Sequence, residues 1–216
     1  MGSDQQHLLR GVKKLSQAGV RFDKGAVLYV DPFGLLSEAG DATYILLTHA
    51  HHDHYSPADI RKVVKADTVF VVPPDLAGQI REEFGEVKIK EVAPGDILSL
   101  GRNGVEVLPA YNLDKPFHPR ENNWVGYILR TDDGSYYLPG DTDVTPEFLQ
   151  ADADVFFVPI GGTYTMDVEQ AAAAINQIRP KLVVPFHYGD LEGVGRREDG
   201  ERFLSLLDEG IAGIIL

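Results

Sequence analysis

Four of the seven histidines in this chain fall within one short stretch, between His49 and His54. The stretch reads Thr-His-Ala-His-His-Asp-His and contains the spacing His-x-His-x-Asp-His. In an extended loop, side chains two residues apart project to the same side, so His49 and His51 could bind the same cation. Asp53 and His54 come directly afterwards and could face a second cation. Imidazole and carboxylate are ligands that zinc, iron and manganese all accept.

A pair of cations needs further ligands from distant segments. Asp141 follows a strand-like run in the tripeptide Gly-Asp-Thr, and a carboxylate at such a strand end could bridge two cations. His187 likewise closes the apolar run that ends in Pro-Phe-His. Either residue alone is more often structural, and a histidine-rich surface loop or a purification tag could also explain the first cluster. Tags lie at termini, however, and three strand ends that each close on a ligand-type residue indicate one shared site.

Short apolar runs bounded by turn residues predict the strands that would position these side chains. The run Tyr44–Thr48 is continuously apolar up to its last residue, which is typical of a strand buried on both faces, and the histidine cluster begins where it stops. Further strands are expected at residues 19–22, 25–30, 69–72, 87–92, 105–109, 124–130, 135–138, 155–159, 182–185 and 211–216.

Helices are predicted between these strands. The clearest runs from Asp167 to Ile178, with Asp167 and Gln170 as a cap pair and Arg179-Pro180 at its end. Other helices are expected to begin at Ser56-Pro57 and to span residues 74–84 and 201–207, with a weaker pattern over 7–18. Strands in antiparallel-looking groups interrupted by helices indicate an α+β fold, a four-layer αββα sandwich of two mixed β-sheets flanked by helices. No linker or repeat interrupts the pattern, so residues 1–216 are expected to form a single domain.

The composition restricts the classes of function. Apolar residues make up 44% of the chain and charged residues 25%, which is ordinary for a globular protein. There is no cysteine, which excludes a disulfide framework, a thiolate zinc site and a cysteine nucleophile. No apolar run approaches the roughly 20 residues of a membrane span, and no signal-peptide pattern is visible, so a cytoplasmic protein is expected. The formal charge of −13 disfavours a nucleic-acid partner.

The motifs THAHHDH, GDTD and PFHYG, in this order and spacing, resemble those of the metallo-β-lactamase superfamily. The stretches FHPRENNWVGYIL and GGTYTMDVEQAAAAINQIRPKLVVPFHYGD look like the branch of small metal-dependent hydrolases related to ascorbate-phosphate lactonase. The resemblance covers most of residues 20–190. It implies a dinuclear metal site with His49 and His51 on the first metal and Asp141 as the bridge. The second metal is then held by Asp53, His54 and His187.

The sequence departs from the family pattern in two places. The superfamily usually has a further histidine in a Pro-Ala-x-His setting, whereas this chain has Pro-Ala-Tyr-Asn, ending at Asn112. Either Asn112 offers its amide oxygen or His118 from the following loop completes the first metal site, and we favour His118. The family's N-terminal Gly-His-Ser is not visible either. The segment Gln17-Ala18-Gly19-Val20 stands in its place, which puts any substrate contact from there in doubt.

Two divalent cations could hold a bridging water and lower its pKa toward neutrality. Zinc is the first choice, with manganese and iron as alternatives. We therefore predict a metal-dependent hydrolase that uses a metal-bridging hydroxide on a small-molecule ester, lactone or phosphoester. The predicted catalytic residues are Asp53, which could shuttle a proton, and Asp141. Asn112 and Tyr164 are predicted to contact the substrate.

Other functions are compatible with the same ligand set. Iron in this site could support an oxidoreductase, and RNA- or DNA-cleaving phosphodiesterases carry the same His-x-His-x-Asp-His spacing. A degenerate protein that binds metal without catalysis is the non-enzymatic alternative, motivated by Asn112. Cleavage of β-lactams is disfavoured, because a fold does not fix a function and a protein without a signal peptide is poorly placed to meet an antibiotic. Whether the chain forms a homo-oligomer stays open.

Overall fold

Two six-stranded β-sheets form the centre of the computed structural model, which describes residues 2–216. In spatial order the first sheet contains β1 (Val12–Lys14), β2 (Val20–Asp23), β3 (Val27–Val30), β4 (Tyr44–Leu46), β5 (Val69–Val72) and β6 (Lys88–Glu91). The second contains β12 (Leu182–Phe186), β11 (Val155–Pro159), β10 (Gly134–Leu138), β9 (Val125–Thr131), β8 (Asn103–Pro109) and β7 (Ile97–Leu100). Strands β3 to β6 and β10 to β12 pair in parallel and the others antiparallel, so both sheets are mixed.

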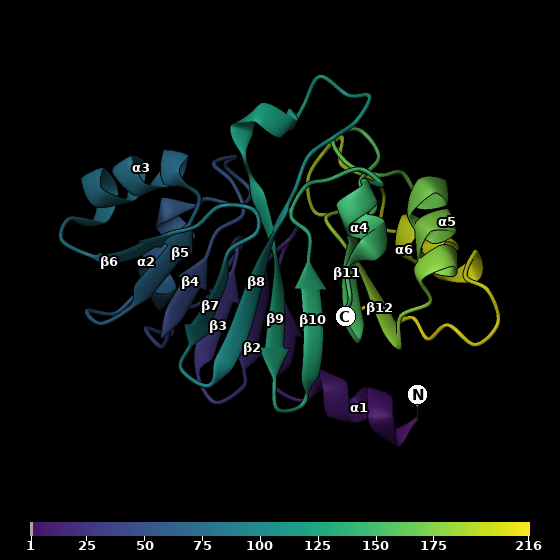
Figure 1. Cartoon of the computed structure of the whole chain (residues 1–216), viewed down its shortest axis with the longest axis horizontal. Coiled ribbons are helices and arrows are strands. Elements are labelled where there is room, and N and C mark those ends of the chain that lie inside the picture. Colours follow the sequence, from purple (N-terminus) through teal and green to yellow (C-terminus); the bar gives the residue numbers. More distant parts are fainter. Residues whose placement is uncertain (1) are drawn as a thin grey trace.

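Helices cover the two outer faces of this pair of sheets (Figure 1). The first sheet is covered by α2 (Pro57–Val63) and α3 (Pro74–Phe84). The second is covered by α4 (Pro146–Gln150), α5 (Val168–Ile178) and α6 (Asp199–Ser205). The short α1 (Ser3–Leu9) lies at one end of the sheets, and the 3-10 helix η1 (Arg120–Asn122) lies between β8 and β9. The order helix, sheet, sheet, helix confirms the predicted four-layer αββα sandwich.

The main core fills the space between the sheets and contains side chains from strands of both. The Phe22 and Tyr136 rings meet edge to face with their centres 5.2 Å apart, and both side chains are fully buried. Tyr127 donates a hydrogen bond from its hydroxyl to the backbone oxygen of Leu47 at 2.7 Å, which links the second sheet to the first. Burying aromatic side chains of this size contributes much of the stability of such a core. The scaffold below the site is therefore well packed.

The structure corrects the sequence-based elements at the two ends of the chain. The helix expected over residues 7–18 ends at Leu9, because the chain turns at Gly11 with φ of 70° and then forms β1 on the edge of the first sheet. The strand expected at 211–216 was wrong, since only Gly213 makes a single parallel bridge to Val183. Besides β1, the elements β7, η1 and α4 were missed from sequence. The Asp167 side chain accepts from the Gln170 backbone N–H, and the reciprocal cap bond is also made, as predicted for α5.

The parallel strands determine where the chemistry-bearing residues meet. The carboxyl ends of parallel strands lie at one edge of a sheet, where the following loops can converge. Strands β3 and β4 of the first sheet and β10 and β12 of the second all end on the same side of the molecule, and each is followed by one of the residues described below. Among the described residues, no helix is both long and apolar enough to cross a membrane.

Candidate metal centre

The loop after β4 is held in place by Asp31, which directly follows β3. The Asp31 carboxylate accepts hydrogen bonds from the Thr48 backbone N–H at 2.8 Å and from the Thr48 hydroxyl at 2.6 Å. It also lies 2.7 Å from Nδ1 of His54, and both of these side chains are buried. A carboxylate in this position fixes the Nδ1–H tautomer and leaves Nε2 of His54 free to face a cation. This role of Asp31 was missed from sequence.

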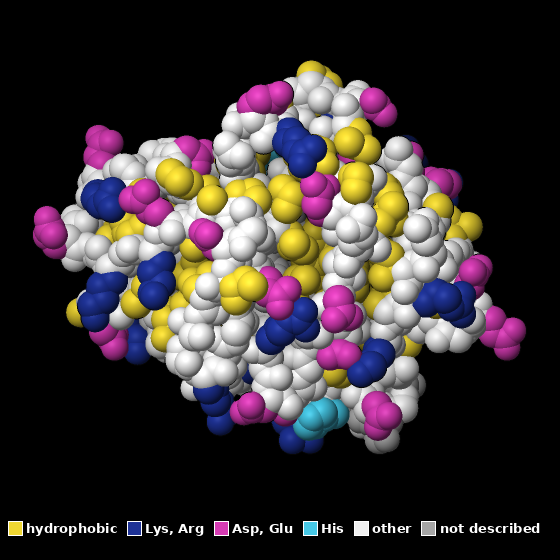
Figure 2. Space-filling model, viewed as in Figure 1, with side chains coloured by type: hydrophobic (Ala, Val, Ile, Leu, Met, Phe, Trp, Pro, Cys, Tyr) yellow, Lys and Arg dark blue, Asp and Glu magenta, His cyan; other side chains and the backbone are white. Residues whose placement is uncertain are grey.

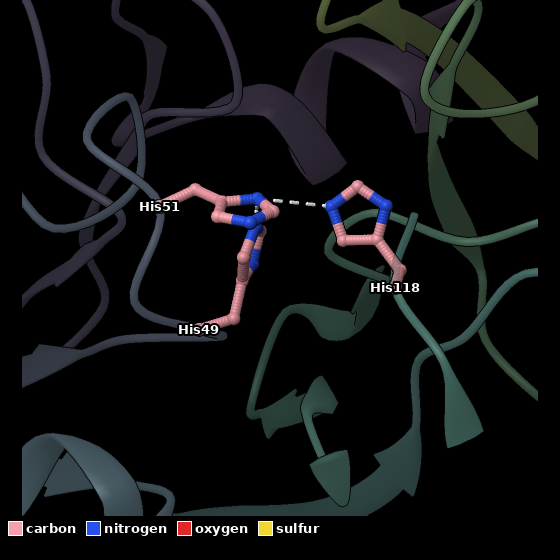
Figure 3. A group of neighbouring side chains, drawn as sticks. All are labelled: His49, His51 and His118. Atoms are coloured by element: carbon pink, nitrogen blue, oxygen red, sulfur yellow. Dashed lines mark hydrogen bonds between the residues drawn. The ribbon is translucent and has the colours of Figure 1, made fainter. Parts of the chain in front are cut away.

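Three imidazole rings from two loops meet at the open end of the site (Figure 3). His49 and His51 come from the loop after β4, and His118 comes from the loop before η1. Nδ1 of His51 lies 3.1 Å from Nε2 of His49 and 3.1 Å from Nε2 of His118. His49 and His118 are buried, whereas His51 is exposed. Nitrogen atoms at this spacing are about as far apart as ligands around one zinc ion with bonds of about 2.0–2.1 Å.

The buried end of the site contains Asp53, His54 and His187, whose ligand-type atoms all lie within 4.8 Å of one another. His187 follows β12 and has φ of 55°, a left-handed conformation that turns its ring back toward the loop after β4. Nε2 of His187 is 3.4 Å from Oδ2 of Asp53. Two loops from different sheets therefore supply this group.

Asp141 lies between the two ends and reaches both of them. Its Oδ1 is 3.2 Å from Nε2 of His54 and 3.1 Å from Nε2 of His187, while its Oδ2 is 3.2 Å from Nε2 of His118. Gly140 permits this approach, since a Cβ there would meet the Thr48 side chain and the Val125 backbone oxygen at 3.0 Å. Seven side chains are brought together in this way: His49, His51, Asp53, His54, His118, Asp141 and His187.

Two buried atoms in this group are suited to a cation. Oδ1 of Asp141 and Nε2 of His54 lie 3.2 Å apart as an ion pair, but neither atom has a partner with hydrogen-bond geometry, although both side chains are buried. Leaving a buried acceptor without a partner is costly unless an ion or a water fills its place. The donor set consists of nitrogen and carboxylate oxygen, which zinc, manganese and iron accept. The residues present therefore fit a metal centre, and the ligand roles predicted for the seven side chains stay predictions.

Charge differs between the two ends of the site. At the open end, burial lowers the pKa of His49 well below its ordinary value, and it lowers the pKa of His51 as well. At the buried end burial acts in the same direction, but the carboxylate of Asp141 outweighs it. The pKa of His54 is therefore raised well above normal, and that of His187 is raised to about 9.

The pKa values of the two carboxyl groups at the buried end shift downward instead. Burial would raise the pKa of Asp141, but the charged rings of His187 and His54 outweigh it and hold that pKa well below its ordinary value. The pKa of Asp53 is also lowered, because its contact with His187 and the charge of His54 outweigh the effect of burial. Both carboxylates are therefore ionised at neutral pH, as metal binding requires.

A cavity of about 460 Å³ opens above the group. Phe117 and Tyr164 form one wall, with their ring centres 4.7 Å apart. Of the two residues predicted to contact the substrate, Tyr164 lines this cavity and Asn112 is not among its lining residues, and the substrate contact of both stays a prediction. The full lining comprises His51, His52, Asp53, Phe117, His118, Asp141, Tyr164, His187, Leu191, Glu192 and Val194.

Asn112 contacts Nδ1 of His118, whereas Nε2 of the same ring faces His51. Its side-chain nitrogen donates to the Tyr164 backbone oxygen at 2.7 Å and is 3.2 Å from Nδ1 of His118. Of the two residues considered for the first metal, the structure brings Nε2 of His118 next to His51 and Asp141, whereas the side-chain nitrogen of Asn112 contacts the other ring nitrogen of His118 and the Tyr164 backbone.

Two further residues contact the group and were not assigned to it from sequence. The Trp124 ring packs against His49 and His51, with ring centres 4.8 and 4.9 Å away, and its Nε1–H donates to Asp75. Gln17 is buried next to Asp53, to which its Nε2 donates at 3.0 Å. No local signal marks the tryptophan. The only sign for Gln17 is that it begins the segment standing where the family has Gly-His-Ser.

Comparison with known proteins gives a consistent result. Residues 12–187 match a family model described as a beta-lactamase superfamily domain. The chain is 31% identical to a UPF0173 metal-dependent hydrolase of Pyrococcus horikoshii over 95% of each chain. It resembles the crystal structure of a protein from Parabacteroides distasonis assigned as a metal-dependent hydrolase, with a TM-score of 0.77, 31% identity and coverage of 94% of this chain and 91% of that one.

A more distant structure shares the fold alone. CmlA, a diiron beta-hydroxylase from Streptomyces venezuelae, superposes with a TM-score of 0.70 at 17% identity. The alignment covers 95% of this chain and 52% of CmlA.

Proposed function

Since this chain belongs to the metallo-β-lactamase superfamily and is a metal-dependent hydrolase, we propose that it holds two divalent cations and hydrolyses a small neutral ester or lactone. The observation that carries the proposal is the position of Asp141. One of its oxygens faces His54 and His187, and the other faces His118. A single carboxylate that contacts both groups of ligands is suited to bridge a pair of cations.

The seven side chains would form two groups of ligands, one for each cation. His49, His51 and His118 would hold the first, while the second would be held by Asp53, His54 and His187, with Asp141 shared between them. When bound, such a pair polarises a carbonyl or phosphoryl oxygen and lowers the pKa of the water between the ions. Zinc is the first choice because the set combines imidazole and carboxylate ligands, and manganese or iron fit the same donors.

Asp53 is the residue best placed to move a proton. Its Oδ2 is held by Gln17, and its other oxygen, Oδ1, takes no part in that contact. Asp53 lines the cavity and is ionised at neutral pH, so Oδ1 can accept a proton from the attacking water and return it to the leaving group. Tyr164 and Phe117 would pack against the acyl or alkoxy part of the substrate.

The lining of the cavity favours a neutral substrate over a phosphoester. None of its residues is lysine or arginine, and Glu192 adds a negative charge at the rim. Sites that take phosphate groups usually supply such cationic side chains. Phe117, Tyr164, Leu191 and Val194 instead offer apolar contacts.

Nucleic acid is also disfavoured as a substrate. Figure 2 shows Asp and Glu side chains scattered among Lys and Arg over the face drawn, without a continuous basic surface there. The formal charge of −13 agrees with this, because nucleic-acid binding depends largely on cationic side chains. A small molecule is therefore the proposed substrate.

A panel of chromogenic substrates tests the proposal. Protein loaded with zinc, manganese or iron is assayed on neutral 4-nitrophenyl esters, aryl lactones and bis(4-nitrophenyl) phosphate. We expect metal-dependent ester or lactone hydrolysis that is lost on chelation, restored by metal, and at least about tenfold faster in kcat/KM than phosphodiester cleavage. Hydrolysis unaffected by chelation, or none with any substrate, would contradict the proposal.

The fold shared with CmlA makes iron chemistry the second candidate, because that protein is a diiron hydroxylase. Metal analysis of protein expressed without added zinc separates the two functions. Two iron ions per chain with oxygen consumption, and no ester hydrolysis in the zinc form, would favour the oxidoreductase.

A further inference from the structure

Gln17 lies in the turn between β1 and β2, at the bottom of the candidate metal centre. Its side chain is fully buried. Its backbone has φ of 54°, a left-handed conformation that is unfavourable for residues other than glycine. A buried polar side chain on a strained backbone is uncommon, and both features need support from the surrounding structure.

The backbone of Gln17 is tied on both sides to the loop after β12. Its N–H donates to Oδ2 of Asp190 at 2.6 Å, and its carbonyl oxygen accepts from the His187 backbone N–H at 3.1 Å. The strained conformation of Gln17 is therefore held by the same loop that carries His187. The position of one residue constrains the other.

The side-chain amide points into the buried end of the metal centre. Nε2 donates to Oδ2 of Asp53 at 3.0 Å and lies 3.4 Å from Nε2 of His187. An ionised carboxylate only accepts hydrogen bonds, so the amide nitrogen must be the atom that faces it. This fixes the orientation of the amide, and its Oε1 is left buried without a hydrogen-bond partner among the described residues.

We propose that Gln17 is a positioning residue of the second cation site, where its Nε2–H group holds the Asp53 carboxylate in place beside His54 and His187. The inference rests on the proposed function, since it requires that Asp53 and His187 bind a cation. Groups that hydrogen-bond to metal ligands orient them, and losing one typically weakens metal binding by about 10- to 100-fold. Gln17 acts on the buried end, because the described contacts of its side-chain amide are with Asp53 and His187.

Two substitutions separate this role from a purely structural one. Gln17→Met keeps the length and burial of the side chain but removes the donor. Gln17→Glu keeps the shape and places an acceptor against the Asp53 carboxylate. Asn103→Leu is the matched control. Asn103 is also buried, donates from its amide nitrogen to a backbone oxygen, that of Lys24, and has an unpartnered side-chain oxygen, but it lies at the start of β8, away from the site.

Stepwise zinc binding to the metal-free proteins, measured by competition with a chromophoric chelator, is the test. We expect the wild type to bind two equivalents. In Gln17→Met, one of the two zinc equivalents, the one bound at the buried end, loses about 10- to 100-fold in affinity. The affinity of the other equivalent stays within about twofold of the wild type. Cobalt spectra identify the affected site, since three imidazoles with the shared Asp141 carboxylate and two imidazoles with two carboxylates are different ligand environments. Gln17→Glu loses at least as much, and Asn103→Leu matches the wild type.

The outcomes are distinguishable. Unchanged affinity in both Gln17 variants would overturn the inference and leave the proposed function intact. Tighter binding in Gln17→Glu would also overturn it, because it would mean that an oxygen at this position ligates the cation directly. A wild type that binds no zinc would overturn the proposed function and the inference together. Should Gln17→Met fail to fold, the near-isosteric Gln17→Glu still gives the decisive comparison.

Discussion

The two ends of the candidate metal centre use different means to prepare for a cation. At the open end, His49, His51 and His118 lie close together, and one carboxylate oxygen of Asp141 contacts His118. Burial lowers the pKa of His49 and His51, so these rings are neutral and their lone pairs are available.

At the buried end, two imidazoles are interleaved with carboxylates. Asp141, Asp53 and Asp31 lie beside His54 and His187. The pKa of both histidines is raised, so in the metal-free protein they carry protons that balance the buried negative charge. On the proposed function, the open end would bind a cation with rings that are already neutral, whereas the buried end would release protons when it binds one. The protons on His54 and His187 stabilise the metal-free protein, because burying a cluster of unpaired carboxylates would lower the free energy of unfolding.

Removing the residue that joins the two ends has the largest expected effect. Asp141→Asn keeps the shape of the side chain but removes its charge and its shared role. We expect kcat to fall by about a thousandfold or more, corresponding to the several kcal/mol that a metal pair contributes. Ester hydrolysis and metal content are measured together. Retention of two tightly bound zinc ions with near-normal turnover would mean that the two ends work independently.

Weakening the support of the buried end comes next. Asp31→Asn removes the charge that orients His54 and anchors Thr48. We expect zinc affinity to fall by about 10- to 100-fold, and the free energy of unfolding of the metal-free protein to fall by about 1.5–3 kcal/mol, as for lost hydrogen bonds to a charged group.

Chelator competition and urea denaturation measure the two quantities for Asp31→Asn. Asp96→Asn, at an exposed turn where the carboxylate accepts from the Ala93 backbone, serves as control. Equal zinc affinity in wild type and Asp31→Asn would contradict the proposed orientation of His54.

Proton exchange separates the two ends directly. Since the pKa of His187 is about 9 in the metal-free protein, its ring is protonated at pH 7 and must lose that proton to bind a cation. Each proton released lowers the apparent affinity by about tenfold per unit as the pH falls from 8 to 6. Calorimetry in buffers with different ionisation enthalpies counts the protons. We expect release to accompany loading of the buried end, and loading of both ends without release would contradict the comparison.

The smallest effect is expected at the wall of the open end. Trp124→Phe keeps an aromatic ring against His49 and His51 but loses the hydrogen bond to Asp75. A loss of about 0.5–1.5 kcal/mol in stability and a change of less than about fivefold in kcat/KM are expected. Thermal unfolding and ester hydrolysis check this, and a loss as large as that of Asp141→Asn would show that the tryptophan acts in the chemistry itself.

Much of the fold could be predicted from local patterns. Buried strands such as β4, β11 and β12 are short apolar runs, and α5 carries its own start and stop signals. The errors lie where local pattern is weak. Strand β7 has four residues, half of them exposed, and α4 has five residues, so neither produces a clear periodicity. The C-terminal segment is apolar enough for a strand, but it meets β12 at one bridge only.

The sequence by itself determined which side chains could do chemistry, because the histidine cluster, Asp141 and His187 each end a recognisable strand. It left open whether Asn112 or His118 joins the first group. It could not reveal Gln17, Asp31 or Trp124 as neighbours of that group. Only the tertiary structure decided these points, since they depend on which strand ends the two sheets bring together across the sandwich. Contacts between residues far apart in the chain, such as those of Gln17 with Asp53 and of Asp141 with His118, arise from that packing and leave no local pattern in the sequence.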